Sequence, residues 1–140
     1  MLNRRLIRIK VFKVLYSCIS SGSNSFAEAE KNMHYSCEKT LHLYYFMLNA
    51  AVALKQAADA KIETGMRKFN PTEEERNPNL KFSENKVSEY LLGNPVFKKY
   101  CEENVLSWNG DLALFVKKLF ASISEKDYFK EYMERESRSM

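Results

Sequence analysis

The sequence has few of the residues that interrupt helices. Its 140 residues include only four glycines and three prolines, and each lies where a helical pattern would start or stop. No segment alternates apolar and polar residues as a half-buried strand does. The hydrophobic share of 45% and the aromatic share of 13% favour a folded chain over a disordered one. These features predict an all-α fold.

Long apolar runs and paired cysteines are also lacking. No apolar run approaches the roughly 18 residues of a membrane span. Lys10 and Lys13 interrupt the apolar N-terminal stretch, which argues against a signal peptide. The three cysteines, Cys18, Cys37 and Cys101, form no CxxC pair and are odd in number. We therefore expect reduced, buried thiols in a cytoplasmic protein.

The sequence contains no Gly-rich phosphate loop, no GxSxG, no HExxH and no EF-hand loop. His34 and Cys37 are three residues apart and share a helical face, but His42 points elsewhere, so we predict no metal site. The acidic run 73–75 has neither a histidine partner nor an apolar pocket that would raise a carboxyl pKa. We expect a protein that is not an enzyme and has no cofactor.

Acidic residues are absent from the N-terminal stretch, where positive charge gathers instead. Residues 1–27 carry five basic side chains and no acidic one, and the whole chain has a net charge of +4. Arg4, Arg5 and Arg8 are three and four residues apart, so they crowd one side of a helix. Cations at a helix N-terminus oppose the macrodipole. The arrangement indicates an anionic partner, with nucleic acid first and an anionic membrane surface second.

The basic stretch 4–20 is also strongly apolar. We expect a helix that begins after Asn3, which is a good N-cap. Its apolar residues fall on two nearly opposite faces, which predicts a helix enclosed at the centre of a bundle. One face contains Ile7, Val11, Val14, Leu15 and Cys18, and the other contains Leu6, Ile9, Phe12 and Tyr16.

A second, longer helical segment follows a Ser-rich loop. Residues 26–64 contain no glycine and no proline, and their apolar residues recur at the α-helical period. The pattern does not decide whether a kink or loop interrupts the segment near 34–36. The part 43–54 is apolar almost all round, which predicts that other helices enclose it. Gly65 suits the position just after the helix end.

Capping residues and proline set the expected helix boundaries in the rest of the chain. Thr72 with Glu75 fits a capping box for one short turn, which Pro78 ends. After Glu134 the chain is polar and is expected to fray. Helices are expected over 84–92 with Ser83 as cap, from Pro95 to about 106, over 112–123, and over a last segment capped by Ser124 with Asp127.

The expected architecture is an antiparallel helical bundle of about five to six helices with one long central helix. We divide the chain into N-terminal helices over 1–64 with the basic helix, a linker over 65–83, and a helical extension over 84–140 that packs on the first part.

The segment RRLIRIKVFKVLY resembles the opening helix of the bacterial transcription antitermination factors of the NusB family. That family begins with an RRxxR pattern followed, after six residues, by Leu-Tyr. Arg4, Arg5 and Arg8 fill the arginine positions, and Leu15–Tyr16 fills the Leu-Tyr position. Where the family often has another arginine this chain has Leu6, and Lys10 and Lys13 add positive charge instead.

Further segments extend the resemblance over most of the chain. Residues 44–63 are similar to the next long helix of the family, and residues 71–82 and 103–133 look like a long-form branch of NusB. In that branch an extended N-terminal helical section precedes the part most like ordinary NusB. On this comparison the chain resembles the N-terminal section alone, so we expect it to lack the C-terminal helices that complete the second bundle.

The resemblance implies an RNA-binding factor that acts in transcription antitermination. NusB-like proteins bind the boxA element of nascent RNA together with the ribosomal protein NusE and help RNA polymerase pass terminators in ribosomal RNA operons. The expected partners are therefore single-stranded boxA-like RNA, NusE and the RNA polymerase antitermination complex. The expected RNA-binding residues are Arg4, Arg5, Arg8, Lys10, Lys13 and Tyr16.

Two other hypotheses stay open. The first is a helical protein–protein interaction module whose basic end is only a solvated tip. The second is a membrane-surface helix at 4–19. Its apolar residues are spread round the helix rather than confined to one face, which argues against this hypothesis. We expect no membrane partner.

Overall fold

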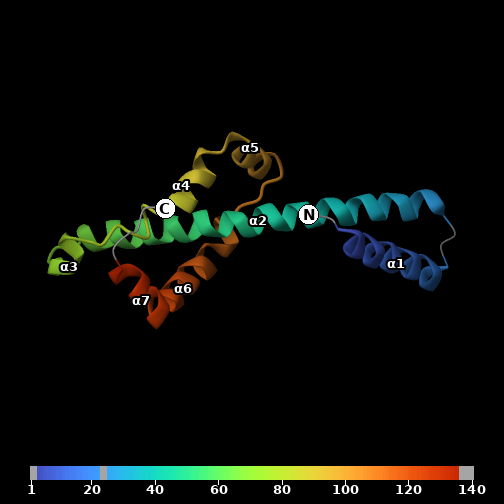
Figure 1. Cartoon of the computed structure of the whole chain (residues 1–140). Helices are drawn as coiled ribbons and strands as arrows, with labels where there is room; N and C mark the ends of the chain where they lie inside the picture. Colours follow the sequence, from blue (N-terminus) through green and yellow to red (C-terminus); the bar gives the residue numbers. More distant parts are fainter. Residues whose placement is uncertain (1–2, 23–24, 136–140) are drawn as a thin grey trace. The chain divides into compact units, whose positions relative to one another are not determined.

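A computed structural model describes residues 3–22 and 25–135 of the chain. Within these residues it is all-α and contains no strand. The helices are α1 (Arg4–Ser21), α2 (Phe26–Met66), α3 (Glu73–Arg76), α4 (Lys86–Gly93), α5 (Pro95–Glu103), α6 (Ala113–Ser124) and α7 (Asp127–Glu134), with a 3₁₀ turn, η1 (Gly110–Leu112), before α6 (Figure 1).

The predicted all-α fold with one long helix is confirmed, since α2 has 41 residues. The described part contains seven α-helices rather than five to six, because the short turn at α3 is a helix of its own. The chain forms two compact units, which divide within α2 between Tyr44 and Tyr45. We refer to residues 3–22 and 25–44 as the N-terminal unit and to residues 45–135 as the C-terminal unit.

In the N-terminal unit α1 runs alongside the first part of α2, with the chain direction reversed (Figure 1). The predicted cap is present, because the Asn3 side chain accepts a hydrogen bond of 2.9 Å from the Leu6 N–H. The helix ends at Gly22, whose φ of +69° lies in the left-handed region that glycine adopts without strain. The Lys10 ammonium links the two helices by donating to the Ser36 carbonyl and hydroxyl oxygens, each at 2.7 Å.

The prediction that the basic helix is enclosed is wrong, because no residue of α1 is buried. Only Lys10, Val14 and Cys18 are half-buried. Within its unit α1 has one neighbour, the first part of α2, so one stripe is covered and the rest of its surface faces solvent.

The long helix α2 is uninterrupted, so the question of a break near 34–36 is answered by a continuous helix. The expected enclosure of 43–54 holds only towards its end. Val52 and Ala53 are buried, whereas Leu43 and Met47 are more than half exposed. Gly65 is also not a terminal residue: it lies in the last turn of α2 and is buried. A Cβ atom at this position would stand 3.2 Å from the Cγ atom of Glu75, so close packing rather than a left-handed turn explains the glycine.

The core of the C-terminal unit lies where α4 and α5 pack against α2. Val52, Leu91 and Phe97 form a buried cluster. Beside it the rings of Tyr45 and Tyr100 stack with centroids 4.0 Å apart. Burial of these apolar groups is what holds the short helices α4 and α5 in place, since eight or nine residues are too few for a stable isolated helix.

A second group of rings joins α6 and α7 to the rest of the C-terminal unit. The rings of Phe82, Phe120 and Phe129 lie within 5.3–6.2 Å of one another. The indole N–H of Trp108 donates to the Phe46 carbonyl oxygen at 2.8 Å, and the two rings stack at 4.3 Å. The two Trp108 contacts hold the segment between α5 and α6 against α2.

In the C-terminal unit the structure confirms one predicted cap and corrects two. Thr72 and Glu75 form the capping box of α3. Ser83 does not cap the next helix, because its hydroxyl donates to the Asp59 carboxylate, and Asn85 caps α4 instead. Ser124 does not cap α7, because its hydroxyl donates to the Phe120 carbonyl oxygen of its own helix. The expected fraying after Glu134 concerns residues that lie mostly outside the described part.

The segment after α5 contains an unusual backbone conformation. Val105 has a φ of +53°, the left-handed region that β-branched residues rarely adopt. Its N–H donates to the Glu102 carbonyl oxygen at 3.2 Å, and the Leu106 N–H donates to the Cys101 carbonyl oxygen at 2.8 Å. This hydrogen-bond pair is the Schellman ending of a helix, with valine where glycine is usual.

Candidate nucleic-acid interface

The three arginines of α1 lie at its exposed N-terminal end. Arg4, Arg5 and Arg8 are all exposed, and the first turn of the helix contains no acidic residue. Across residues 3–22 and 25–135, none of the three takes part in an ion pair. Their charge is therefore available to an outside anion, and it opposes the helix dipole as the sequence predicts.

The two predicted lysines differ in their surroundings. Lys13 is exposed and, like the arginines, is without an ion pair in the described part of the chain. Lys10 is half-buried and uses its ammonium group to bind Ser36. Sequence periodicity gave no sign of this contact, because the partner lies 26 residues away. Lys10 therefore connects α1 to α2 and is the least accessible of the five cations.

Tyr16 is 65% exposed, and Phe12, one turn before it, is 69% exposed. The two rings stack with centroids 6.3 Å apart and planes inclined by 22°. The sequence pattern predicts Phe12 on a packing face, whereas the structure leaves it exposed. Its spacing of four residues from both Arg8 and Tyr16 was the available signal that it shares their side of the helix.

The other apolar side chains of this side of α1 are also exposed. Leu15 is 52% exposed and Ile19 is 80% exposed. With Phe12 and Tyr16 they are spaced i, i+3, i+4 and i+7, which places them in one stripe. Half-buried Val14 and Cys18 lie on the side that packs against α2. The outer surface of α1 thus combines a basic N-terminal end with an apolar, partly aromatic stripe.

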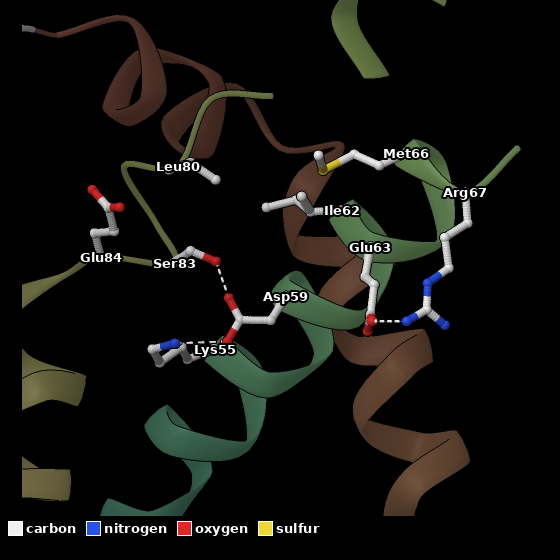
Figure 2. Close-up of a pocket in the computed structure, with 9 residues that line it drawn as sticks. All are labelled: Lys55, Asp59, Ile62, Glu63, Met66, Arg67, Leu80, Ser83 and Glu84. Carbon is white, nitrogen blue, oxygen red and sulfur yellow. Dashed lines mark hydrogen bonds and ion pairs between the residues drawn. The ribbon is translucent and has the colours of Figure 1, made fainter. Parts of the chain in front are cut away.

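The C-terminal unit contains an open groove of about 500 Å³ between α2 and the segment that precedes α4. Figure 2 shows two ion pairs among its charged side chains, Lys55–Asp59 and Glu63–Arg67. Lys55 contacts the Asp59 carboxylate at 2.6 Å, and Ser83 donates a hydrogen bond to the same carboxylate. Arg67 and Glu63 form a second pair at 2.5 Å.

The chemistry of this groove does not indicate catalysis. Burial raises the pKa of Asp59, but the hydrogen bonds from Lys55 and Ser83 outweigh it, so this pKa lies below its ordinary value. A carboxylate held ionised in this way is a poor general acid at neutral pH. No histidine or cysteine lines the groove. The Ser83 hydroxyl is bonded to a carboxylate whose low pKa makes it a weak base.

The residues weighed as metal ligands do not come together. Nowhere in the described ranges do three or more His, Cys, Asp or Glu side chains form a group that would hold a metal ion. The three cysteines are free and half-buried, and burial raises the pKa of the Cys101 thiol, which makes it less reactive. None of the described helices is both long enough and apolar enough to cross a membrane.

Comparisons of the chain with protein-family models, with curated proteins and with solved structures find no match.

Proposed function

We propose that this protein is an RNA-binding, non-enzymatic factor of the NusB type, which acts in transcription antitermination on nascent ribosomal RNA. Its fold would be a NusB-like antiparallel bundle. The observation that carries the proposal is the exposed, acid-free cluster of Arg4, Arg5 and Arg8 at the start of α1. The RRxxR and Leu-Tyr pattern supports the same function, with single-stranded boxA-like RNA, NusE and the RNA polymerase antitermination complex as partners.

Electrostatics favours a phosphate backbone as the ligand of this cluster. An exposed arginine presents several N–H donors in a planar fork that matches phosphate oxygens. Three arginines within two turns of one helix can follow consecutive phosphates, whereas the same charges in an isolated helix tip only weaken the helix. Lys13 extends the positive field along α1, and Tyr16 supplies a ring that single-stranded RNA can contact.

The test is a fluorescence-anisotropy titration of a labelled, boxA-like single-stranded RNA at several salt concentrations. The variant Arg4→Ala/Arg5→Ala/Arg8→Ala should bind more weakly. It should also flatten the plot of log affinity against log salt by about 2, because each single-strand phosphate contact contributes a slope of about 0.7. Circular dichroism at 222 nm should show undiminished helicity, since the three side chains are exposed.

A matched control removes the same charge elsewhere. Lys117, Lys118 and Lys126 are exposed residues of the C-terminal unit that form no ion pair with any described residue. The variant Lys117→Ala/Lys118→Ala/Lys126→Ala should keep the affinity and the salt slope of the unchanged chain. Equal weakening by both triple variants would show that net charge alone drives binding and would contradict an RNA site on α1.

A helical protein–protein interaction module is the second candidate. The exposed stripe on α1 favours it, because an amphipathic helix face spaced i, i+3, i+4 and i+7 is the pattern that enters an apolar groove. This candidate predicts that the titration shows no salt-dependent RNA binding and that a helical partner binds without RNA.

A further inference from the structure

We infer that Phe12 and Tyr16 form a stacking platform for two unpaired bases of the RNA. This inference rests on the proposed function, and it adds Phe12 to the binding residues. The aromatic part of the site would select single strands over duplexes and would show little base specificity.

The exposure of the two rings is the first argument. Phe12 is 69% exposed and Tyr16 is 65% exposed, so neither ring gains much from folding. The rings contact each other in a stacked arrangement, 6.3 Å between centroids. Two neighbouring rings that are mostly exposed offer a surface for base stacking, and such stacking is tolerant of sequence because every base has a flat π face.

The position of the rings relative to the arginines is the second argument. Arg8, Phe12 and Tyr16 are spaced i, i+4 and i+8, so they lie in one row along α1. Successive members of the row are about 6 Å apart along the axis, at roughly 1.5 Å per residue. A strand whose phosphates meet Arg8 can therefore place its next bases over the rings without leaving the helix surface.

The third argument concerns the competing occupants of this surface. Leu15 and Ile19 belong to the same exposed stripe, so an anionic membrane and an apolar protein groove are alternatives. A membrane and a protein groove bind aliphatic side chains as well as rings. A nucleic acid is the anionic ligand whose bases stack on flat rings, and the aromatic pair is the part of the stripe that adjoins the arginines.

The experiment replaces both rings by leucine, which keeps apolar area but removes stacking. Phe12→Leu/Tyr16→Leu is compared with the unchanged chain and with Tyr90→Leu/Tyr128→Leu, which alters two exposed tyrosines of the C-terminal unit. The probes are a 12-nucleotide uridine strand, a 12-nucleotide adenosine strand and a 12-base-pair RNA duplex, each followed by fluorescence anisotropy. A strand that carries 2-aminopurine reports stacking through the quenching of its fluorescence.

The platform predicts that Phe12→Leu/Tyr16→Leu weakens binding of both single strands by at least about fivefold for each ring. The quenching of 2-aminopurine should be lost, while the salt slope stays unchanged because the arginines are intact. Duplex binding should not change, and the Tyr90→Leu/Tyr128→Leu variant should behave as the unchanged chain.

The outcomes separate this inference from the proposed function. If the unchanged chain binds RNA with a steep salt dependence and the leucine variant binds and quenches equally well, the platform is refuted while the function stands. If the unchanged chain binds no RNA, both are refuted. Co-sedimentation with anionic lipid vesicles that survives both leucine substitutions, in the absence of RNA binding, would assign the surface to a membrane.

Discussion

Val105→Gly should stabilise the C-terminal unit, because it removes a strained backbone conformation without removing packing. Val105 has a φ of +53° and its side chain is 83% exposed. A non-glycine residue pays about 1–2 kcal/mol for the left-handed region, and a β-branched one lies at the upper end. Gly22 occupies the equivalent position at the end of α1, where it has a φ of +69°.

The expected net gain is smaller than the strain that is relieved. Glycine adds about 0.5–1 kcal/mol of backbone entropy to the unfolded chain, so the gain in the free energy of unfolding should be about 1 kcal/mol. With a urea dependence of about 2 kcal/mol per molar, the unfolding midpoint should rise by about 0.5 M.

Trp108 provides the assay, since it is the single tryptophan of the chain and its indole bonds to Phe46 within the same unit. Urea unfolding followed by its fluorescence therefore reports the unit that contains Val105. Val105→Ala is the control. Alanine keeps most of the left-handed penalty and should shift the midpoint far less than glycine. A midpoint for Val105→Gly at or below that of the unchanged chain would refute the assignment of strain.

Two further substitutions test the C-terminal unit. Phe97→Ala should lower its free energy of unfolding by about 3–5 kcal/mol, because the ring is 6% exposed in the apolar cluster with Val52 and Leu91; a loss well under 1 kcal/mol in urea unfolding would contradict this packing. Asp59→Asn should make the free energy of unfolding less dependent on acid pH. The pKa of Asp59 in the folded chain lies below the unfolded value near 3.8. The ionised carboxylate therefore stabilises the fold above that value, and this stabilisation is lost as the pH falls through the folded pKa. The stability difference between the unchanged chain and the variant should therefore shrink between pH 6 and pH 3, and a constant difference would disprove the role of Asp59.

The sequence predicted those helix boundaries that depend on neighbouring residues alone. The Asn3 cap, the Thr72–Glu75 box and Pro95 at the first position of α5 depend on residues within one helical turn, and all three are present. Of the two caps that failed, Ser124 bonds the Phe120 carbonyl oxygen of its own helix, whereas Ser83 was taken by a distant residue. Ser83 was an acceptable cap, but Asp59, 24 residues away, binds its hydroxyl, and Asn85 takes its place.

The candidate site was predicted only in part for a related reason. The arginines were found because charge and spacing are visible in the sequence. α1 is apolar on two faces, and the sequence does not state that only one face has a neighbour, so Phe12 was assigned to packing although it is exposed. The hydrogen bonds from Lys10 to Ser36 are likewise tertiary contacts, which no local sequence pattern predicts.

Ultraviolet cross-linking of the full chain to a boxA-like single-stranded RNA, followed by tryptic digestion and mass spectrometry, measures directly where RNA lies on the protein. Cleavage after the lysines places Phe12 in the peptide 11–13 and Tyr16 in the peptide 14–31. An RNA site on the outer surface of α1 predicts that these two peptides carry the cross-linked nucleotides and lose them when Arg4, Arg5 and Arg8 are replaced by alanine. Cross-links confined to residues 45–135, or unchanged by the arginine substitutions, would contradict it.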